Sequence, residues 1–143
     1  MARADRNTYT SVIPEYYSDF LITFERNPVT GLLKKISNED AIKQSVILTV
    51  LTTLGERFYQ PHFGSKIETS LFDLADATTS ELIKSTIEIS LKNFEPRALV
   101  RDVSVHPTYP VDDTHAYTVI VQFECINLPG QMFEVEIDLK RLR

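Results

Sequence analysis

The last third of the chain alternates between apolar and polar side chains. Three runs, residues 98–106, 116–126 and 131–139, repeat with a period of two. Because successive side chains of a β-strand point to opposite faces, this pattern predicts three antiparallel strands with one buried face and one face in water. The last run shows both sides most clearly: Phe133, Val135, Ile137 and Leu139 are apolar, and Glu134, Glu136 and Asp138 are charged.

A helical pattern begins near Asn38 and ends at Gly55. Ser37 and Asp40 have the spacing of a capping box, in which two side chains satisfy backbone amides at the start of a helix. Gly55 suits the position after a helix, because glycine accepts a positive φ. A wide apolar face and small hydroxyls opposite it predict a helix buried on most sides. These residues are Ile42, Val46, Ile47, Val50, Leu51 and Leu54, and Ser45, Thr49, Thr52 and Thr53.

A second, amphipathic helix is expected over residues 78–94. Thr78 and Glu81 form another potential capping box. The helix should stop before Pro96, because a residue that precedes proline avoids the α region. Its apolar stripe consists of Ile83, Ile87, Leu91 and Phe94, widened by Leu82 and Ile89.

Two further segments complete the fold. A hairpin is expected, with strands at residues 20–25 and 32–36 and a turn from Pro28 to Gly31. The segment "GERFYQPHFG" links the two helices; we expect Phe58 and Phe63 to fill the core there, followed by a short helix near 66–72.

The predicted class is α+β: two main helices packed on a small antiparallel sheet, with an N-terminal β-hairpin and a C-terminal three-stranded β region. We expect an N-terminal arm at residues 1–18 and a single domain at 19–143, since 143 residues suit one core.

The formal net charge of −5 disfavours nucleic-acid binding. The basic cluster at residues 140–143 is expected to be a solvated end. No apolar run approaches the roughly 18 residues of a transmembrane helix, so no membrane partner is expected. A single cysteine, Cys125, fits a reducing compartment and a core position. These features predict a soluble protein that folds in the cytoplasm.

The sequence offers no constellation for catalysis, a metal or a cofactor. The acids lie mostly on outward faces, and Arg97 should keep Glu95 ionised, whereas a general acid needs a raised pKa. His62, His106 and His115 fall in separate segments without ligand spacing. A binding or assembly module is therefore expected, and no enzyme.

The segment "AIKQSVILTVLTTLGERFYQPHFGSKIETSLFD", followed by a helix ending in "NFEPR", resembles the small baseplate wedge proteins of contractile-tailed phages and their type VI secretion relatives. The resemblance covers about residues 20–139. It implies a structural subunit, despite the "lysozyme-like" label some members carry. It implies binding to the larger wedge proteins and a template for the first tail-sheath ring, within a six-fold virion baseplate assembled in the host cytoplasm.

The resemblance implies two docking surfaces. The first is the tripeptide Glu95, Pro96 and Arg97, where proline makes a rigid corner; alternatively, the tripeptide stops a helix and closes an internal ion pair. The second is a sheet edge from the C-terminal hairpin, Tyr117–Ile126 with Met132–Leu139, to which sheath strands would add. Its candidate residues are Met132, Glu134, Glu136 and Asp138; alternatively, these edge charges merely block aggregation.

Two other functions stay open at the level of sequence. A regulatory adaptor could use the same fold, since fold does not fix function. Neighbouring genes for sheath, tube and spike proteins would argue against the adaptor. A hydrolase would reveal itself in a peptidoglycan-clearing assay. Phage tail, tailocin and secretion machine are also alternatives, of which the general resemblance favours a phage.

Overall fold

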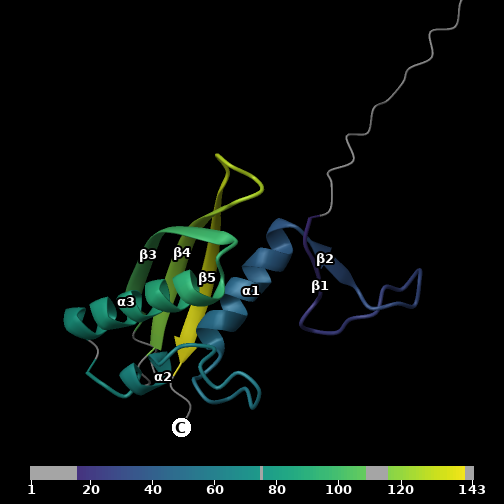
Figure 1. Ribbon diagram of the computed structural model, residues 1–143. Helices are drawn as coiled ribbons and strands as arrows, with labels where there is room; N and C mark the ends of the chain where they lie inside the picture. Colours follow the sequence, from purple (N-terminus) through teal and green to yellow (C-terminus); the bar gives the residue numbers. More distant parts are fainter. Residues whose placement is uncertain (1–15, 75, 109–115, 141–143) are drawn as a thin grey trace, which may run out of the picture.

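The structure is a computed structural model that describes residues 16–74, 76–108 and 116–140. It is α+β, as predicted, with a two-stranded sheet β1–β2 and a three-stranded antiparallel sheet in the order β3–β4–β5. Figure 1 shows α3 lying across one face of the larger sheet, α1 beside β5, and the hairpin extending beyond α1. The elements are β1 (Ser18–Phe20), β2 (Lys35–Ser37), α1 (Glu39–Leu51), α2 (Ile67–Ser70), α3 (Ala77–Phe94), β3 (Ala98–Thr108), β4 (Ala116–Cys125) and β5 (Met132–Lys140).

The alternating pattern of the C-terminal strands is confirmed. The inward side chains of β4 and β5 form the centre of the core, while Glu134, Glu136 and Asp138 are exposed on the opposite face. There Glu134 accepts a hydrogen bond from Gln122 at 3.1 Å, and Asp138 accepts one from Thr118 at 3.2 Å. The buried residues are Tyr117, Val119, Val121, Phe123, Cys125, Val135, Ile137 and Leu139.

A β-bulge in β3 adjusts which side chains face the core. The pairing with β4 shifts between Val100 and Asp102, so Arg101 is the extra residue. Ala98 and Val103 lie an odd number of residues apart, and both are buried because of this shift. Arg101 instead points to Glu124 of β4, with Nη2 2.7 Å from Oε2.

The second helix starts earlier than predicted and buries a narrower stripe. Its N-cap is Asp76, whose Oδ1 accepts a hydrogen bond from the Thr79 amide at 2.8 Å, so the predicted Thr78 capping box is wrong. That bond also lowers the pKa of Asp76. Leu82 and Ile89 are more than half exposed, because α3 rests on the sheet along one side only. The buried apolar residues of α3 are Ile83, Ile87 and Leu91.

The first helix has a different start from the predicted one. Asn38 occupies the N-cap with a φ of 50° and no side-chain capping bond, so the Ser37 and Asp40 capping box is wrong. The Asn38 side chain instead accepts a hydrogen bond from the Tyr16 amide at 2.9 Å. The start of α1 therefore holds the chain that leads into the hairpin.

The same helix ends at Leu51, four residues before Gly55, which contradicts the predicted helix end. The chain turns away because the Ser65 amide bonds the Thr52 carbonyl at 2.9 Å. A Cβ at Gly64 would lie 2.3 Å from the Thr52 oxygen, so this close approach requires glycine. Within the helix only Asp40 and Leu51 are exposed, and Thr49 on the hydroxyl face is 1% exposed, so the predicted burial on most sides is confirmed. Its buried residues are Ala41, Ile42, Val46, Thr49 and Val50.

The hairpin is present with its predicted turn, but its strands are shorter and shifted: β1 ends at Phe20, and β2 overlaps the predicted 32–36 only at residues 35–36. Residues 21–25 are irregular, contrary to the predicted strand at 20–25, and Phe24 has a φ of 51°. Gln44 of α1 bonds the backbone of this irregular stretch: its Nε2 donates to the Phe20 carbonyl at 2.8 Å, and its Oε1 accepts from the Ile22 amide at 2.9 Å. The hairpin is thus anchored to α1 by one side chain that pairs with its backbone.

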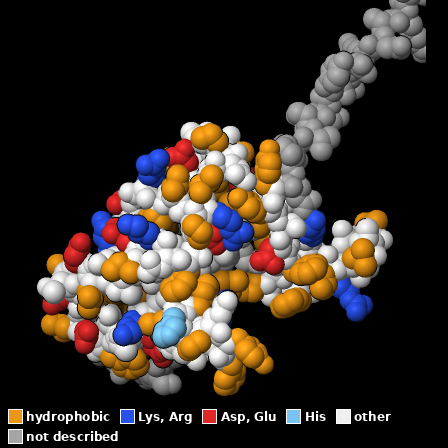
Figure 2. Space-filling model, in the orientation of Figure 1, with side chains coloured by type: hydrophobic (Ala, Val, Ile, Leu, Met, Phe, Trp, Pro, Cys, Tyr) orange, Lys and Arg blue, Asp and Glu red, His pale blue; other side chains and the backbone are white. Residues whose placement is uncertain are grey.

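The connection between the helices contains α2, within the range expected from the sequence. Phe58, however, is 96% exposed and does not fill the core, so that expectation is wrong. Phe63 is partly buried. Its ring centroid lies 5.1 Å from the centroid of the Phe94 ring, and the Arg57 guanidinium lies 3.9 Å from the Phe63 centroid. Figure 2 shows hydrophobic side chains standing clear of the body at the lower edge, where this loop lies.

This difference between two phenylalanines can be measured. We expect Phe63→Ala to lower the free energy of unfolding by about 2 kcal/mol, since it removes a packed ring. Phe58→Ala, at an exposed position, should change it by less than about 0.5 kcal/mol. Urea denaturation of both variants checks the prediction, and equal losses would contradict the placement of the Phe58 ring in water.

Candidate docking surfaces

The corner between α3 and β3 is built by the backbone of Glu95. Its amide donates to the Leu91 carbonyl at 2.8 Å, and its carbonyl accepts from the Ala98 amide at 3.1 Å. Its φ of −127° and ψ of 69° lie outside the helical region, as proline at the next position requires. Pro96 therefore ends the helix as predicted, and the corner has a fixed direction.

The Glu95 side chain points inward and closes an ion pair. It is 2% exposed, and its carboxylate accepts two hydrogen bonds from Arg97, Nε to Oε1 at 2.6 Å and Nη2 to Oε2 at 2.7 Å. The Ser45 hydroxyl of α1 also donates to Oε2. The internal ion pair considered from the sequence is thus present, and partner binding by the tripeptide stays a prediction.

The two charges of this pair hold each other ionised. Burial is the largest influence on the Glu95 carboxyl and by itself raises its pKa. The hydrogen bonds from Arg97 and Ser45 and the charge of Arg97 together outweigh burial, so the pKa of Glu95 is lowered. In turn, the hydrogen bond to Glu95 is the main cause of a raised pKa for Arg97.

Arg97 links the corner to the hairpin. Its side chain is 36% exposed, and its guanidinium lies 5.1 Å from the centroid of the Tyr17 ring, within cation–π range. The site therefore joins three segments of the chain: the residues before β1 through Tyr17, α1 through Ser45, and the corner through Arg97. Sequence reasoning missed Tyr17 and treated Ser45 as a packing residue. No local signal marks contacts between residues 52 or more positions apart in the chain.

The larger sheet has two outer strands, β3 and β5, and the predicted edge corresponds to the one on β5. The strand order places β4 in the middle, so Tyr117–Ile126 has neighbours on both sides and cannot be an edge. The prediction that Tyr117–Ile126 contributes one half of the edge is therefore wrong. Met132–Leu139, the other half, belongs to β5, which pairs with β4 on one side within the described residues.

The direction of the backbone amides shows which positions of β5 face outward. The Ile126 amide donates to the Arg97 carbonyl at 3.2 Å and therefore points toward β3. Because amide direction alternates along a strand, the amides of the odd-numbered residues of β4 point toward β5. The pairing of β4 with β5 then turns the odd-numbered residues of β5 toward β4. Pro107 of β3 is consistent with this assignment. It lies opposite Tyr117, whose amide points away toward β5, so position 107 needs no N–H for the pairing of β3 with β4. The outward positions are Met132, Glu134, Glu136 and Asp138.

The described residues contain no cluster of three or more His, Cys, Asp or Glu side chains able to hold a metal ion. Cys125 is buried, and burial raises the pKa of its thiol. No helix among them is long and apolar enough to cross a membrane. Residues 1–15 of the predicted arm, His115 and residues 141–143 of the basic end lie outside the described part of the chain.

The fold and these surfaces define a small α+β protein with an open antiparallel sheet and a rigid charged corner. The family model for baseplate wedge protein gp25 matches residues 36–126. Baseplate wedge protein gp25 of Enterobacteria phage T4 is 28% identical over 99 residues, which cover 69% of this chain and 73% of that protein. The chain belongs to the gp25 family of baseplate wedge proteins, structural components of contractile tails, and the predicted resemblance is confirmed.

Solved structures show the same fold at low sequence identity. A putative tail lysozyme from Geobacter sulfurreducens is 22% identical, with a TM-score of 0.65 over 73% of this chain and 92% of that one. A chain of the anti-feeding prophage baseplate is 20% identical, with a TM-score of 0.60 over 85% and 83%. A chain of the type VI secretion baseplate complex is 15% identical, with a TM-score of 0.56 over 71% and 88%.

Proposed function

We propose that this chain joins the larger wedge proteins of a phage-tail baseplate through its charged corner and templates the first sheath ring through β5. The observation that best supports this role is the free edge of β5, with its outward amides at Met132, Glu134, Glu136 and Asp138. An exposed strand edge binds an extended partner segment through main-chain hydrogen bonds. The family membership supports a position in the baseplate; a location in the virion and six-fold assembly in the host cytoplasm belong to the proposal.

At the corner, the three residues would have different roles. Pro96 fixes the direction, and buried Glu95 holds the guanidinium in place through Nε and Nη2 of Arg97. Among the described residues no hydrogen bond engages Nη1 of Arg97, which carries two N–H donors suited to a carbonyl or carboxylate on a wedge partner. Arg97 is thus the contact residue, and Glu95 positions it.

Hydrolysis is not part of the proposed function. Glu95 is held ionised by Arg97, whereas a general acid must carry a proton near neutral pH. Glu134, Glu136 and Asp138 lie on an exposed sheet face, where Glu134 and Asp138 accept hydrogen bonds from side chains of β4. We propose a purely structural subunit, without a cofactor.

Co-purification with the larger wedge proteins tests the corner. The double variant Glu95→Gln/Arg97→Gln removes both charges but keeps side chains of similar size. We expect its affinity for the wedge proteins to fall at least about tenfold, as loss of a docked arginine commonly costs about 2 kcal/mol or more.

A matched control removes a charge pair elsewhere on the same two elements. Lys84 and Asp102 form a partly exposed ion pair at 3.5 Å between α3 and β3, away from the corner, so Lys84→Gln/Asp102→Asn should bind like the wild type. Circular dichroism would confirm that both variants fold. Equal binding by all three proteins would reduce the tripeptide to a helix stop.

A further inference from the structure

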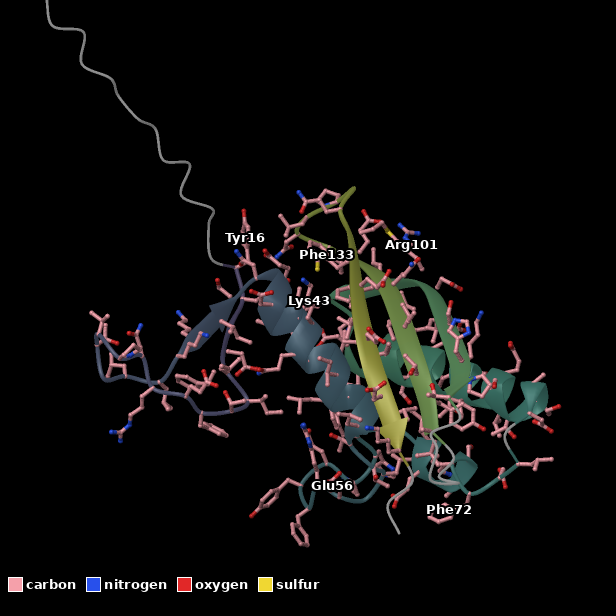
Figure 3. All side chains as sticks on the ribbon, turned by 180° about the vertical axis from the view of Figure 1, so that it is seen from behind. Tyr16, Lys43, Glu56, Phe72, Arg101 and Phe133 are labelled. Carbon is pink, nitrogen blue, oxygen red and sulfur yellow. The ribbon has the colours of Figure 1, made fainter. Side chains whose placement is uncertain are left out.

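A groove of about 550 Å³ lies at the C-terminal end of β5. It is bounded by the end of α1, the loop after it, α2 and the last three residues of the strand. Figure 3 shows Glu56 and Phe72 on either side of this end of β5. Because Asp138 lines the groove and is also an outward position of the edge, the groove continues the free edge without a gap.

The groove has an apolar floor and apolar walls. Ile67, Leu71 and Leu139 are at least 94% buried and form the floor with Val50. Leu51 and Phe72 stand at the sides and are 51% and 54% exposed. Such a surface gains free energy when an apolar side chain covers it.

The rim of the groove is acidic. Glu56, Glu68 and Asp138 line it, against one lysine, Lys140. The Thr53 amide bonds one oxygen of Glu56 at 3.0 Å, and the Thr53 hydroxyl bonds one oxygen of Glu68 at 3.1 Å, so both carboxylates are held beside the groove. Among the described residues no lysine or arginine forms an ion pair with these three acids. The rim therefore favours a positively charged ligand.

We infer that the groove receives the end of the sheath segment that adds to β5, and that this end carries a large apolar side chain beside lysine or arginine. The inference rests on the proposed strand addition. A strand paired to the outward amides of Glu136 and Asp138 continues directly over the groove, because Asp138 is part of the edge of β5 and also lines the groove. The main chain then supplies affinity along the edge, and the groove selects the sequence at its end.

Cysteine protection tests the location of the contact. Leu51→Cys places a thiol at the wall of the groove, and Leu82→Cys places one on α3 at a position of the same 51% exposure. Native Cys125 is buried and should not interfere. With saturating purified sheath protein from the same tail, we expect maleimide labelling at position 51 to slow at least about tenfold and labelling at position 82 to stay unchanged.

Charge reversal tests the selection of a basic end. Glu56→Lys/Glu68→Lys should weaken sheath binding about tenfold at about 50 mM salt, and less at about 500 mM, because salt screens exposed charges. Unchanged affinity at low salt, or labelling of the Leu51→Cys thiol at its free rate in the complex, would overturn the inference.

The variant Glu136→Pro separates the two proposals. If Glu136→Pro loses binding but the sheath protein leaves the Leu51→Cys thiol unprotected, strand addition stands and only the inference about the groove is refuted. Full binding by Glu136→Pro refutes strand addition and the groove with it.

Discussion

Replacing Arg97 with alanine is expected to lower the free energy of unfolding by about 3 kcal/mol at pH 7. The variant leaves the Glu95 carboxylate, 2% exposed, with the Ser45 hydroxyl and no opposite charge. Breaking a buried ion pair by removing one partner costs about 3–5 kcal/mol, and the partial exposure of Arg97 favours the lower value. Urea denaturation at pH 7 measures the loss.

The pH dependence of this loss has a definite sign. In the wild type the pKa of Glu95 is lowered, so its contribution to stability is complete above the ordinary value of 4.5 and is lost as the pH falls through the folded pKa. Without Arg97, burial should raise the pKa of the same carboxyl. The variant then gains stability as the pH falls from 7 toward about 4.5, and the difference between the two proteins shrinks.

The neutral double variant Glu95→Gln/Arg97→Gln is the control for this prediction. It removes the buried charge together with its partner, so its loss at pH 7 should be smaller than that of Arg97→Ala. Its stability should also lack the pH dependence of Glu95. Equal stability of Arg97→Ala and the wild type at pH 7 would show that water reaches the Glu95 carboxylate.

The second large effect is expected at β5, where Glu136→Pro should abolish sheath binding. Proline removes an outward N–H and places its ring where the added strand must lie. An edge strand tolerates proline at such a position, so we expect the free energy of unfolding to change by only about 1 kcal/mol. Binding of purified sheath protein and urea denaturation measure the two quantities.

Glu136→Gln separates the backbone from the side chain. It removes the charge but keeps the amide, so it should bind sheath protein like the wild type. If the glutamine variant also fails to bind, the charge matters and main-chain pairing is not the explanation. If the proline variant binds normally, the edge charges of β5 have only the protective role considered from the sequence.

Local patterns in the sequence were sufficient for most elements. The period of two at residues 131–139 identified β5 and its exposed face, because side-chain direction in a strand depends on the backbone alone. Pro96 identified the end of α3 for a similarly local reason. The Glu95–Arg97 pair was also foreseeable as one of two alternatives, since the residues lie two positions apart.

Long-range contacts account for the errors. The first helix ends early because Ser65 and Gly64 pack against Thr52, which no pattern near Gly55 reveals. Phe58 was assigned to the core by its residue type, although the fold leaves it in water. The Asn38 side chain bonds Tyr16, a residue 22 positions away, and is not used to cap its own helix.

By itself, the sequence determined the class of the fold, the two faces of its sheet and the family to which the chain belongs. The tertiary structure decided that β4 is central and β5 an edge strand, that Ser45 and Tyr17 join Arg97 at the corner, and that an acidic groove continues β5. The physical reason is the range of the interactions. Backbone direction and helix ends depend on neighbouring residues, whereas strand order and surface shape depend on segments that meet only after the chain has folded.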